Sequence, residues 1–363
     1  MKKIVFVIES LAGGGAERVV SILANDLARS GYDISILMIF EDVVKYHIDS
    51  KVNLKGIELE KPHGLRRNIE RLQKIRNEIN KIKPDVVISF LALVNIATIS
   101  SLLLTKYPII LSERNDPKHE PASGKERLLR NLLYSLREKN YFVFQTEYAK
   151  KCFPKRIQRK STIIYNPLRT DLPDPYVGLR KNTIVCVARL QPDKNISLLL
   201  HAFARFHKKI PSYFLEIYGE GPLLDQLKKE CKELEINHFV IFKGFVNNVD
   251  EMIVDSSMFV LPSNYEGISN AMIEAMAIGI PTISTDSPAY GARSFIKNGE
   301  NGFLIGVNNE EELYNRMVDI AENLDLTNKF SCNAAKIRET LDEKIIKDQW
   351  IDFINICINS GDV

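Results

Sequence analysis

The sequence predicts an α/β protein with two doubly wound parallel sheets, one in each half of the chain. Its 363 residues are about twice the size of a common domain. The hydrophobic fraction of 45% and the charged fraction of 26% are ordinary for a soluble globular protein. Short apolar runs alternate with longer helical patterns, which is typical of βαβ units. The predicted strands are 4–8, 34–40, 86–89, 109–111 and 141–145, then 183–187, 213–218, 240–242, 258–261 and 281–284.

A proline-rich segment, 161–182, separates these two sets of strands and is the best candidate for a linker. We therefore expect a first domain at 1–166 and a second at 167–343. The last helix, 344–359, carries an apolar stripe that includes Trp350. Periodicity alone does not say which domain that stripe contacts.

The composition indicates the compartment and the kinds of partner to expect. The net charge of +3 is too small to indicate bulk nucleic-acid binding, and the five cysteines form no CxxC pair, as expected in a reducing compartment. The apolar run 4–8 is too short for a signal peptide, and the stretch 90–104 is shorter than the roughly 20 residues that span a bilayer. We expect a cytoplasmic protein in which any membrane contact is peripheral.

A glycine loop, Gly13 to Gly15, lies between the first strand and an amphipathic helix. Glycine lets the backbone approach a phosphate or sugar, and the helix N-terminus supplies N–H groups. A dinucleotide site is one interpretation, but Arg18 stands where the third glycine of that fingerprint belongs. A purely structural turn is the other interpretation.

Two cations follow the first strand of the second half, in VARLQPDKN. Arg189 and Lys194 would lie at the carboxyl edge of the sheet, where open α/β folds bind ligands. A guanidinium and an ammonium held there can neutralise a diphosphate without a metal ion. Gly219 and Gly244 follow later strands and suit close ligand approach, although a tight turn needs glycine equally.

Two carboxylates flank a predicted helix start in EGISNAMIEAMAIGIPTI. Glu266 lies just before the helix and Glu274 about one turn inside it, with Ser269 or Asn270 as the N-cap. A carboxylate on such an apolar helix is costly unless it has a partner, which favours a function for Glu274. The exposed N–H groups of this start form a candidate anion site: Gly267, Ile268, Ser269 and Asn270.

In this order the motifs GGGAERV, VARLQPDKN, YGEGPL, KGFV and EGISNAMIEAMAIGIPTI resemble the retaining GT-B glycosyltransferases of family 4. The resemblance covers nearly the whole chain and is most specific over 183–286. It implies two Rossmann-like domains facing a cleft, with the final helix returning to the N-terminal acceptor domain. The segments ISFLALVNIA and LSERNDP are similar to bacterial members that transfer hexose or N-acetylhexosamine units onto polyprenyl-diphosphate-linked glycans.

The resemblance also implies roles for the residues of the second half. Arg189 and Lys194 would stabilise the departing nucleotide diphosphate of a UDP-sugar, Glu266 would contact the transferred sugar and Glu274 the ribose. Val246 would join Gly244 beside the base. Gly14 and Gly15 would lie by the phosphate and the acceptor. No cofactor is implied beyond the nucleotide-sugar co-substrate.

The acceptor side departs from the family pattern. Many members carry histidine after the fourth N-terminal strand, where this chain has Glu113 in SERN. Glu113, Arg114 and Glu17 are therefore the candidates for contacts with the acceptor or sugar. Neither a DxD motif nor histidines at metal-ligand spacing occur in the sequence, so we expect no metal site. No residue is an obvious covalent nucleophile, and the family's favoured explanation of retention is front-face attack assisted by the leaving diphosphate.

The predicted helix 65–83 carries seven cations and two acids beside an apolar stripe. Its net charge, seven minus two, is +5 and exceeds that of the whole chain. A solvated outer face is one interpretation. The other is contact of Arg67, Arg71 and Lys74 with anionic lipid headgroups or with the diphosphate of a lipid-linked acceptor, and the basic segment 150–160 could add to it.

Three function classes remain open on the sequence. A glycosyltransferase that acts in bacterial surface glycan assembly is the leading interpretation. A GT-B UDP-sugar epimerase would share the architecture, and a non-catalytic nucleotide-sugar-binding subunit would bind the donor without turnover.

Overall fold

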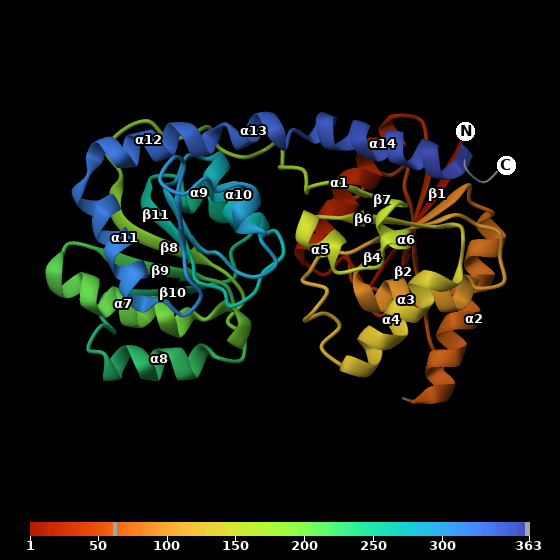
Figure 1. Ribbon diagram of the computed structural model, residues 1–363, viewed down its shortest axis with the longest axis horizontal. Helices are drawn as coiled ribbons and strands as arrows, with labels where there is room; N and C mark the ends of the chain where they lie inside the picture. The colour runs from red at the N-terminus through yellow and green to blue at the C-terminus, as the bar shows by residue number, and fades with distance from the viewer. Residues whose placement is uncertain (61–63, 360–363) are drawn as a thin grey trace. The chain divides into compact units, whose positions relative to one another are not determined.

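The computed structural model describes residues 1–60 and 64–359. The chain forms two compact units, and the first combines Met1–Pro167 with Glu343–Val363. The second unit is Leu168–Asp342. Each is built around its own parallel sheet (Figure 1).

The first unit has a seven-stranded sheet with the order β3-β2-β1-β4-β5-β6-β7, and all its pairs are parallel. Its strands are β1 Lys3–Ile8, β2 Asp33–Met38, β3 Asn53–Gly56, β4 Val86–Phe90, β5 Ile109–Ser112, β6 Asn140–Phe144 and β7 Ser161–Ile163. The central strands are buried on both faces, which is why they read as continuous apolar runs.

Helices cover both faces of this sheet (Figure 1). One face carries α1 Gly15–Arg29 and α14 Glu343–Asn359. The other carries α2 Leu65–Ile82, α3 Ala92–Leu102, α4 Gly124–Leu136, α5 Glu147–Lys151 and α6 Lys155–Gln158. Ile75 of α2, Ile99 of α3 and Leu133 of α4 share one buried cluster with Val5 of β1.

The final helix α14 belongs to the first unit and contacts α1 and β4. Trp350 is fully buried and stacks on Phe90, the last residue of β4, with 5.7 Å between ring centroids. Lys2 Nζ donates to Asn355 Oδ1 at 2.7 Å. An apolar stripe and one polar contact therefore join the two ends of the chain.

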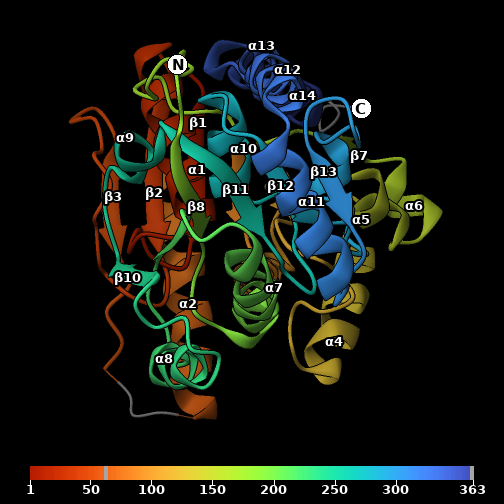
Figure 2. The same ribbon diagram turned by 90° about the vertical axis from the view of Figure 1, so that its left-hand side faces the viewer.

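The second unit has a six-stranded parallel sheet with the order β10-β9-β8-β11-β12-β13. Its strands are β8 Lys181–Val187, β9 Phe214–Tyr218, β10 Val240–Gly244, β11 Ser256–Leu261, β12 Thr282–Thr285 and β13 Phe303–Ile305. Its helices are η1 Pro192–Lys194, α7 Ile196–Lys209, α8 Leu224–Glu233, α9 Val249–Ile253, α10 Asn270–Ala277, η2 Ala292–Ser294, α11 Glu310–Glu322, α12 Leu324–Ala335 and α13 Ile337–Thr340. Figure 2 looks onto this unit, with β8 and β11 between α7 and α10.

The predicted fold class is confirmed, and all ten predicted strands overlap observed ones. Three short strands near sheet edges were not predicted: β3, β7 and β13. The predicted stripe of α2 is wrong in its first turns, because Leu65 and Ile69 are exposed whereas Ile75 and Ile79 are buried. Among the described residues, no helix is both long and apolar enough to cross a bilayer.

Candidate functional site

The predicted donor residues follow the two central strands of the second sheet. β8 and β11 are neighbours, yet β8 connects through α7 to β9 on one side and β11 connects through α10 to β12 on the other. The loops that leave them therefore diverge at the carboxyl edge. Such a switch point is where open α/β sheets bind ligands.

Lys194 and Glu266, which are 72 residues apart in the chain, meet at this switch point. Lys194 Nζ lies 2.6 Å from Glu266 Oε2 and 3.0 Å from Asp193 Oδ2. Burial alone would lower the pKa of Lys194, but the carboxylates of Glu266 and Asp193 outweigh it and raise that pKa above its usual value. The ammonium is thus held in its charged form, as a cation that serves a diphosphate must be.

Hydrogen bonds between the two loops fix this pair. Asn264 N–H donates to the Asp193 carbonyl at 2.8 Å, and Asn195 Nδ2 donates to Asn264 Oδ1 at 3.0 Å. Asn195 takes a left-handed conformation, with φ of 49°, and is the N-cap of α7. Ser263 Oγ also donates to Glu266 Oε2, at 3.3 Å. The carboxylate of Glu266 is therefore positioned by two side chains before any ligand is considered.

Arg189 lies two residues after β8, and its side chain is exposed. Among the described residues, 1–60 and 64–359, none forms a hydrogen bond or ion pair with its guanidinium. Its five donors are consequently open to an anionic ligand. The predicted partners Arg189 and Lys194 thus differ: one is a solvated fork and the other a buried, paired ammonium.

The glycines after β9 are required by the backbone of the β8 loop. A Cβ on Gly219 would lie 2.0 Å from the Ala188 carbonyl oxygen, and one on Gly221 would lie 2.4 Å from that of Leu190. Gly244 has a φ of 68°, in the left-handed region, and its carbonyl accepts from Gly219 N–H at 2.8 Å. Val246, two residues further on, is half-buried. Close packing therefore accounts for Gly219 whether or not a ligand also approaches it.

The start of α10 has the capped geometry that the sequence predicts. Ser269 is the N-cap, and its hydroxyl accepts from Met272 N–H at 3.4 Å. Gly267 and Ile268 are buried, while Ser269 and Asn270 are half-buried. Glu274 is buried in the body of the helix.

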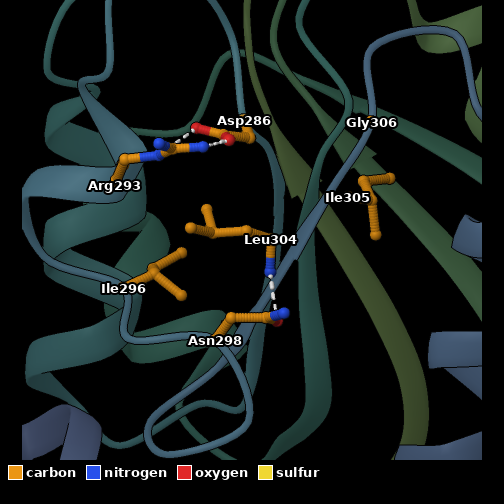
Figure 3. Close-up of a pocket in the computed structure, with 7 residues that line it drawn as sticks. All are labelled: Asp286, Arg293, Ile296, Asn298, Leu304, Ile305 and Gly306. Atoms are coloured by element: carbon orange, nitrogen blue, oxygen red, sulfur yellow. Dashed lines mark hydrogen bonds and ion pairs between the residues drawn. The ribbon is translucent and has the colours of Figure 1, made fainter.

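A second loop closes over this helix start. A Cβ on Gly291 would lie 1.6 Å from the Gly267 carbonyl oxygen, so only glycine fits at position 291. Beside it, Asp286, Arg293, Ile296, Asn298, Leu304, Ile305 and Gly306 line an open concavity of about 490 Å³ (Figure 3). Asp286 binds Arg293 through both carboxylate oxygens there. None of the donor residues predicted from the sequence lines this concavity.

The glycine loop of the first unit directly precedes α1. Gly13 has a φ of 125°, which favours glycine, and Gly14 is the N-cap of the helix. Gly15 is exposed at the first position of α1. A Cβ on Gly14 would lie 2.1 Å from Glu17 Oε2, so the Glu17 carboxylate folds back over the helix start.

Glu113, a candidate for a contact with the acceptor or sugar, is enclosed in the first unit. Glu113 is 1% exposed, its carboxylate accepts from the Tyr134 hydroxyl, and Arg130 Nη1 lies 4.0 Å from its Oε2. Burial raises the pKa of this carboxyl, although Arg130 and Tyr134 act against it. Glu113 thus lies in the core with Tyr134 and Arg130 as partners, and its role toward an acceptor stays a prediction.

Arg114 is buried as well. Its Nη1 donates to Asn166 Oδ1 at 2.8 Å, and its guanidinium carbon lies 4.6 Å from the centre of the Phe90 ring and 5.6 Å from that of Trp350. Burial lowers the pKa of Arg114 to about 9. These contacts tie β5 to β4 and α14, a structural task that the sequence did not indicate.

The three cations singled out on α2 are only partly exposed. Arg71 Nε donates to the Ile39 carbonyl at 3.0 Å, and its guanidinium lies over the Phe40 ring. Lys74 Nζ lies 3.0 Å from a carboxylate oxygen of Glu70, and Arg67 is half-buried. Arg71 and Lys74 are therefore engaged within their own unit and are poorly placed for lipid headgroups.

Sequence reasoning missed several residues that shape the site. Asp193 could have been found, because it adjoins Lys194 in the same short motif. Asn264 and Gly291 carried no local signal, since their importance comes from packing against loops distant in sequence. In the described part of the chain, no group of three or more His, Cys, Asp or Glu residues could hold a metal ion.

Comparisons with known proteins show which family has this sequence. The family model "Glycosyltransferase Family 4" matches residues 13–172, and "Glycosyl transferases group 1" matches residues 175–337. An uncharacterized glycosyltransferase of Haemophilus influenzae is 30% identical over 366 residues, covering 96% of this chain and 99% of that protein.

A second relative is the GalNAc-α-(1→4)-GalNAc-α-(1→3)-diNAcBac-PP-undecaprenol α-1,4-N-acetyl-D-galactosaminyltransferase of Campylobacter jejuni. It is 26% identical over 362 residues, with 98% of each protein covered. Among solved structures, Anabaena HepE in complex with UDP and glucose superposes with a TM-score of 0.85 at 17% identity, covering 98% of this chain and 100% of that one. The chain therefore belongs to the GT-B glycosyltransferases of family 4.

Proposed function

We propose that this glycosyltransferase transfers a hexose or N-acetylhexosamine from a UDP-sugar to a polyprenyl-diphosphate-linked glycan, with retention of anomeric configuration. The observation that carries the donor half of this proposal is the Lys194–Glu266 pair, held 2.6 Å apart at the switch point of the second sheet. The structural relative HepE was solved with UDP and glucose, which supports a UDP-linked donor.

The acceptor half rests on relatives. The Campylobacter jejuni enzyme described above is named for an acceptor on undecaprenol diphosphate, and it aligns along nearly the whole chain. An acceptor of this kind is anchored in a bilayer by its lipid. The protein would then act at the inner face of the cell membrane, as a peripheral protein.

The chemistry requires little more than charge placed at the leaving group. The bond between the anomeric carbon and the β-phosphate oxygen breaks, and the acceptor hydroxyl oxygen bonds to the same face of that carbon. The hydroxyl proton passes to the departing diphosphate. Arg189 and Lys194 stabilise the charge that develops on the diphosphate, and this preorganised stabilisation accounts for most of the rate. These two cations serve in place of a metal ion.

The carboxylates have a different task in this proposal. Glu266 accepts hydroxyl hydrogen bonds from the transferred sugar while it orients Lys194. Glu274 accepts from the ribose, and the N–H groups at the start of α10 face the donor phosphate or sugar. Neither carboxylate acts as a covalent nucleophile.

The test begins with the donor, because it can be identified without knowing the acceptor. We expect thermal stabilisation of the protein by UDP-sugars but not by GDP- or ADP-sugars. Transfer from the stabilising donor to a short-prenyl diphosphate glycan, with the product linkage read by NMR, then tests reaction and stereochemistry. Conversion of the donor without an acceptor would indicate an epimerase, and donor binding without turnover on any acceptor would indicate a non-catalytic subunit.

A further inference from the structure

Helix α4 exposes a leucine face. Leu128, Leu129, Leu132 and Leu136 are all exposed, with Leu128 at 72%. At about 100° per residue these four positions fall within a quarter or so of the helix circumference. The opposite side is buried through Leu133 and Tyr134. The helix is thus apolar on two sides, and only one of them packs against its own sheet.

The neighbouring helix extends this face. α3 and α4 pack side by side (Figure 1), and Arg137 Nη2 at the end of α4 donates to the Thr105 and Tyr107 carbonyls, both at 2.9 Å. These bonds bring the segment after α3 to the end of α4, where Leu103 and Leu104 are also exposed, the latter at 85%. Scattered exposed leucines are ordinary, whereas a contiguous set on one helix marks an interaction surface.

Exposed cations lie on the helix that packs beside α4. α6 packs against α4, and the segment 150–160 that contains it carries six cations and no acid. Lys151, Lys155, Arg156 and Arg159 are exposed. Lys125 lies on the same side of α4 as the leucines and is exposed as well. An apolar stripe with flanking Lys and Arg is the pattern of a helix that lies in a membrane interface.

Charge decides between the two occupants that an apolar face could have. A second copy of this chain, docked face to face, would bring two sets of these cations together. An anionic bilayer offers phosphates to the cations and an acyl boundary to the leucines. Of the three α2 cations expected at the membrane, Arg71 and Lys74 are engaged within the unit.

We propose that α4 and α6 form the membrane-docking surface of this protein, with the leucines of α4 in the acyl boundary and the cations of α6 at anionic phospholipid headgroups. The inference rests on the proposed function, since a lipid-linked acceptor requires an enzyme at the bilayer. The membrane contact is thereby placed on α4 and α6, rather than on α2, for which the sequence left a lipid contact or a solvated face open.

The test is flotation of the full-length protein with vesicles of phosphatidylcholine alone and of phosphatidylcholine mixed with phosphatidylglycerol. We expect wild type to bind only the mixed vesicles, and less so at high salt. The triple variant Leu128→Gln, Leu132→Gln, Leu136→Gln should bind about tenfold more weakly or worse, because it removes the apolar contact while keeping good helix formers. Leu179→Gln with Leu324→Gln, two exposed leucines of the second unit, is the matched control and should bind as wild type does.

A second variant tests the surface without touching the leucines. Lys155→Glu, Arg156→Glu, Arg159→Glu should abolish the preference for phosphatidylglycerol. Both triple variants should keep wild-type melting temperature, donor binding and transfer to a water-soluble short-prenyl acceptor, and lose transfer to an acceptor embedded in vesicles.

Undiminished vesicle binding by both triple variants would overturn the docking surface. So would a wild-type dimer, seen by light scattering, that the leucine variant dissociates, since the leucine face would then join two copies. Vesicle binding that depends on α4, together with no transfer to any acceptor, would support the surface and contradict the proposed function.

Discussion

Lys194 Nζ lies 2.6 Å from Glu266 Oε2, although the two residues come from different loops 72 positions apart. The pair forms because β8 and β11 are adjacent at the point where the strand order reverses. It gives the site a buried cation whose charge is secured by carboxylates. That cation would face the diphosphate of the donor.

Replacing Lys194 should remove most of the catalysis. We expect Lys194→Ala to lower kcat by about 10²–10³, by analogy with the loss of one preorganised donor to a developing anion. Lys208→Ala, at an exposed lysine of α7, is the control and should leave kcat unchanged. Steady-state kinetics with melting temperatures for both variants would check this, and a fully active Lys194→Ala protein would exclude the leaving-group role.

Glu266→Gln should lower the rate of transfer and shift the pH dependence of kcat/KM. Glu266 is a main contributor to the raised pKa of Lys194, whereas burial lowers it. Without that carboxylate the pKa falls, so the alkaline limb of kcat/KM should shift to lower pH. Asp193→Asn should shift the limb in the same direction with a smaller loss of rate, because Asp193 is not placed against the sugar. An unmoved limb in both variants would show that the ammonium of Lys194 is not required in its charged form.

Gly291→Ala tests the loop that closes over the start of α10. The added Cβ would meet the Gly267 carbonyl oxygen at 1.6 Å, so the loop must move. We expect a loss of about 1–3 kcal/mol in the free energy of unfolding, together with weaker donor binding. Gly124→Ala, where the nearest atom is a flexible arginine end at 3.6 Å, should be neutral. Chemical denaturation and donor titration measure both effects.

Glu113 should make the protein less stable as the pH rises. Burial raises its pKa in the folded state above the ordinary value of 4.5, so the folded state binds this proton more tightly than the unfolded chain does. The associated stability is complete below that value and is lost as the pH rises through the folded-state pKa. Glu113→Gln should lack this decline, which unfolding curves from about pH 4.5 upward would reveal. Identical pH dependence in both proteins would show that Glu113 is ionised in the fold without cost.

Trp350→Ala should release the end of the chain from the first unit. The indole is fully buried and stacks on Phe90, so its removal should cost about 3–5 kcal/mol of unfolding free energy. Ile356→Ala, on an exposed position of the same helix, should cost much less. Both substitutions change helix propensity, but only Trp350→Ala removes a buried side chain, so the difference between the two losses of unfolding free energy measures the packing of α14.

The alternation of apolar runs with helical patterns was enough to predict both sheets, because buried parallel strands must be continuously apolar. The missed strands β3, β7 and β13 are short and lie at or near sheet edges, where this constraint relaxes. The placement of Arg189, Lys194 and Glu266 beyond the carboxyl ends of β8 and β11 could be predicted, because each lies in a loop that follows a strand, and their roles toward a donor stay predictions. The burial of Glu113 could not be predicted, since it depends on a contact with Tyr134, 21 residues further along the chain.

Transfer from a UDP-sugar to a short-prenyl diphosphate glycan, measured side by side for wild type and Lys194→Ala, tests whether Lys194 stabilises the leaving diphosphate. We expect wild type to form a glycoside with the anomeric configuration of the donor. Lys194→Ala, equally well folded, should form it about 10²–10³-fold more slowly. Equal rates for the two proteins would exclude this role of Lys194, and a product of inverted configuration would exclude retention.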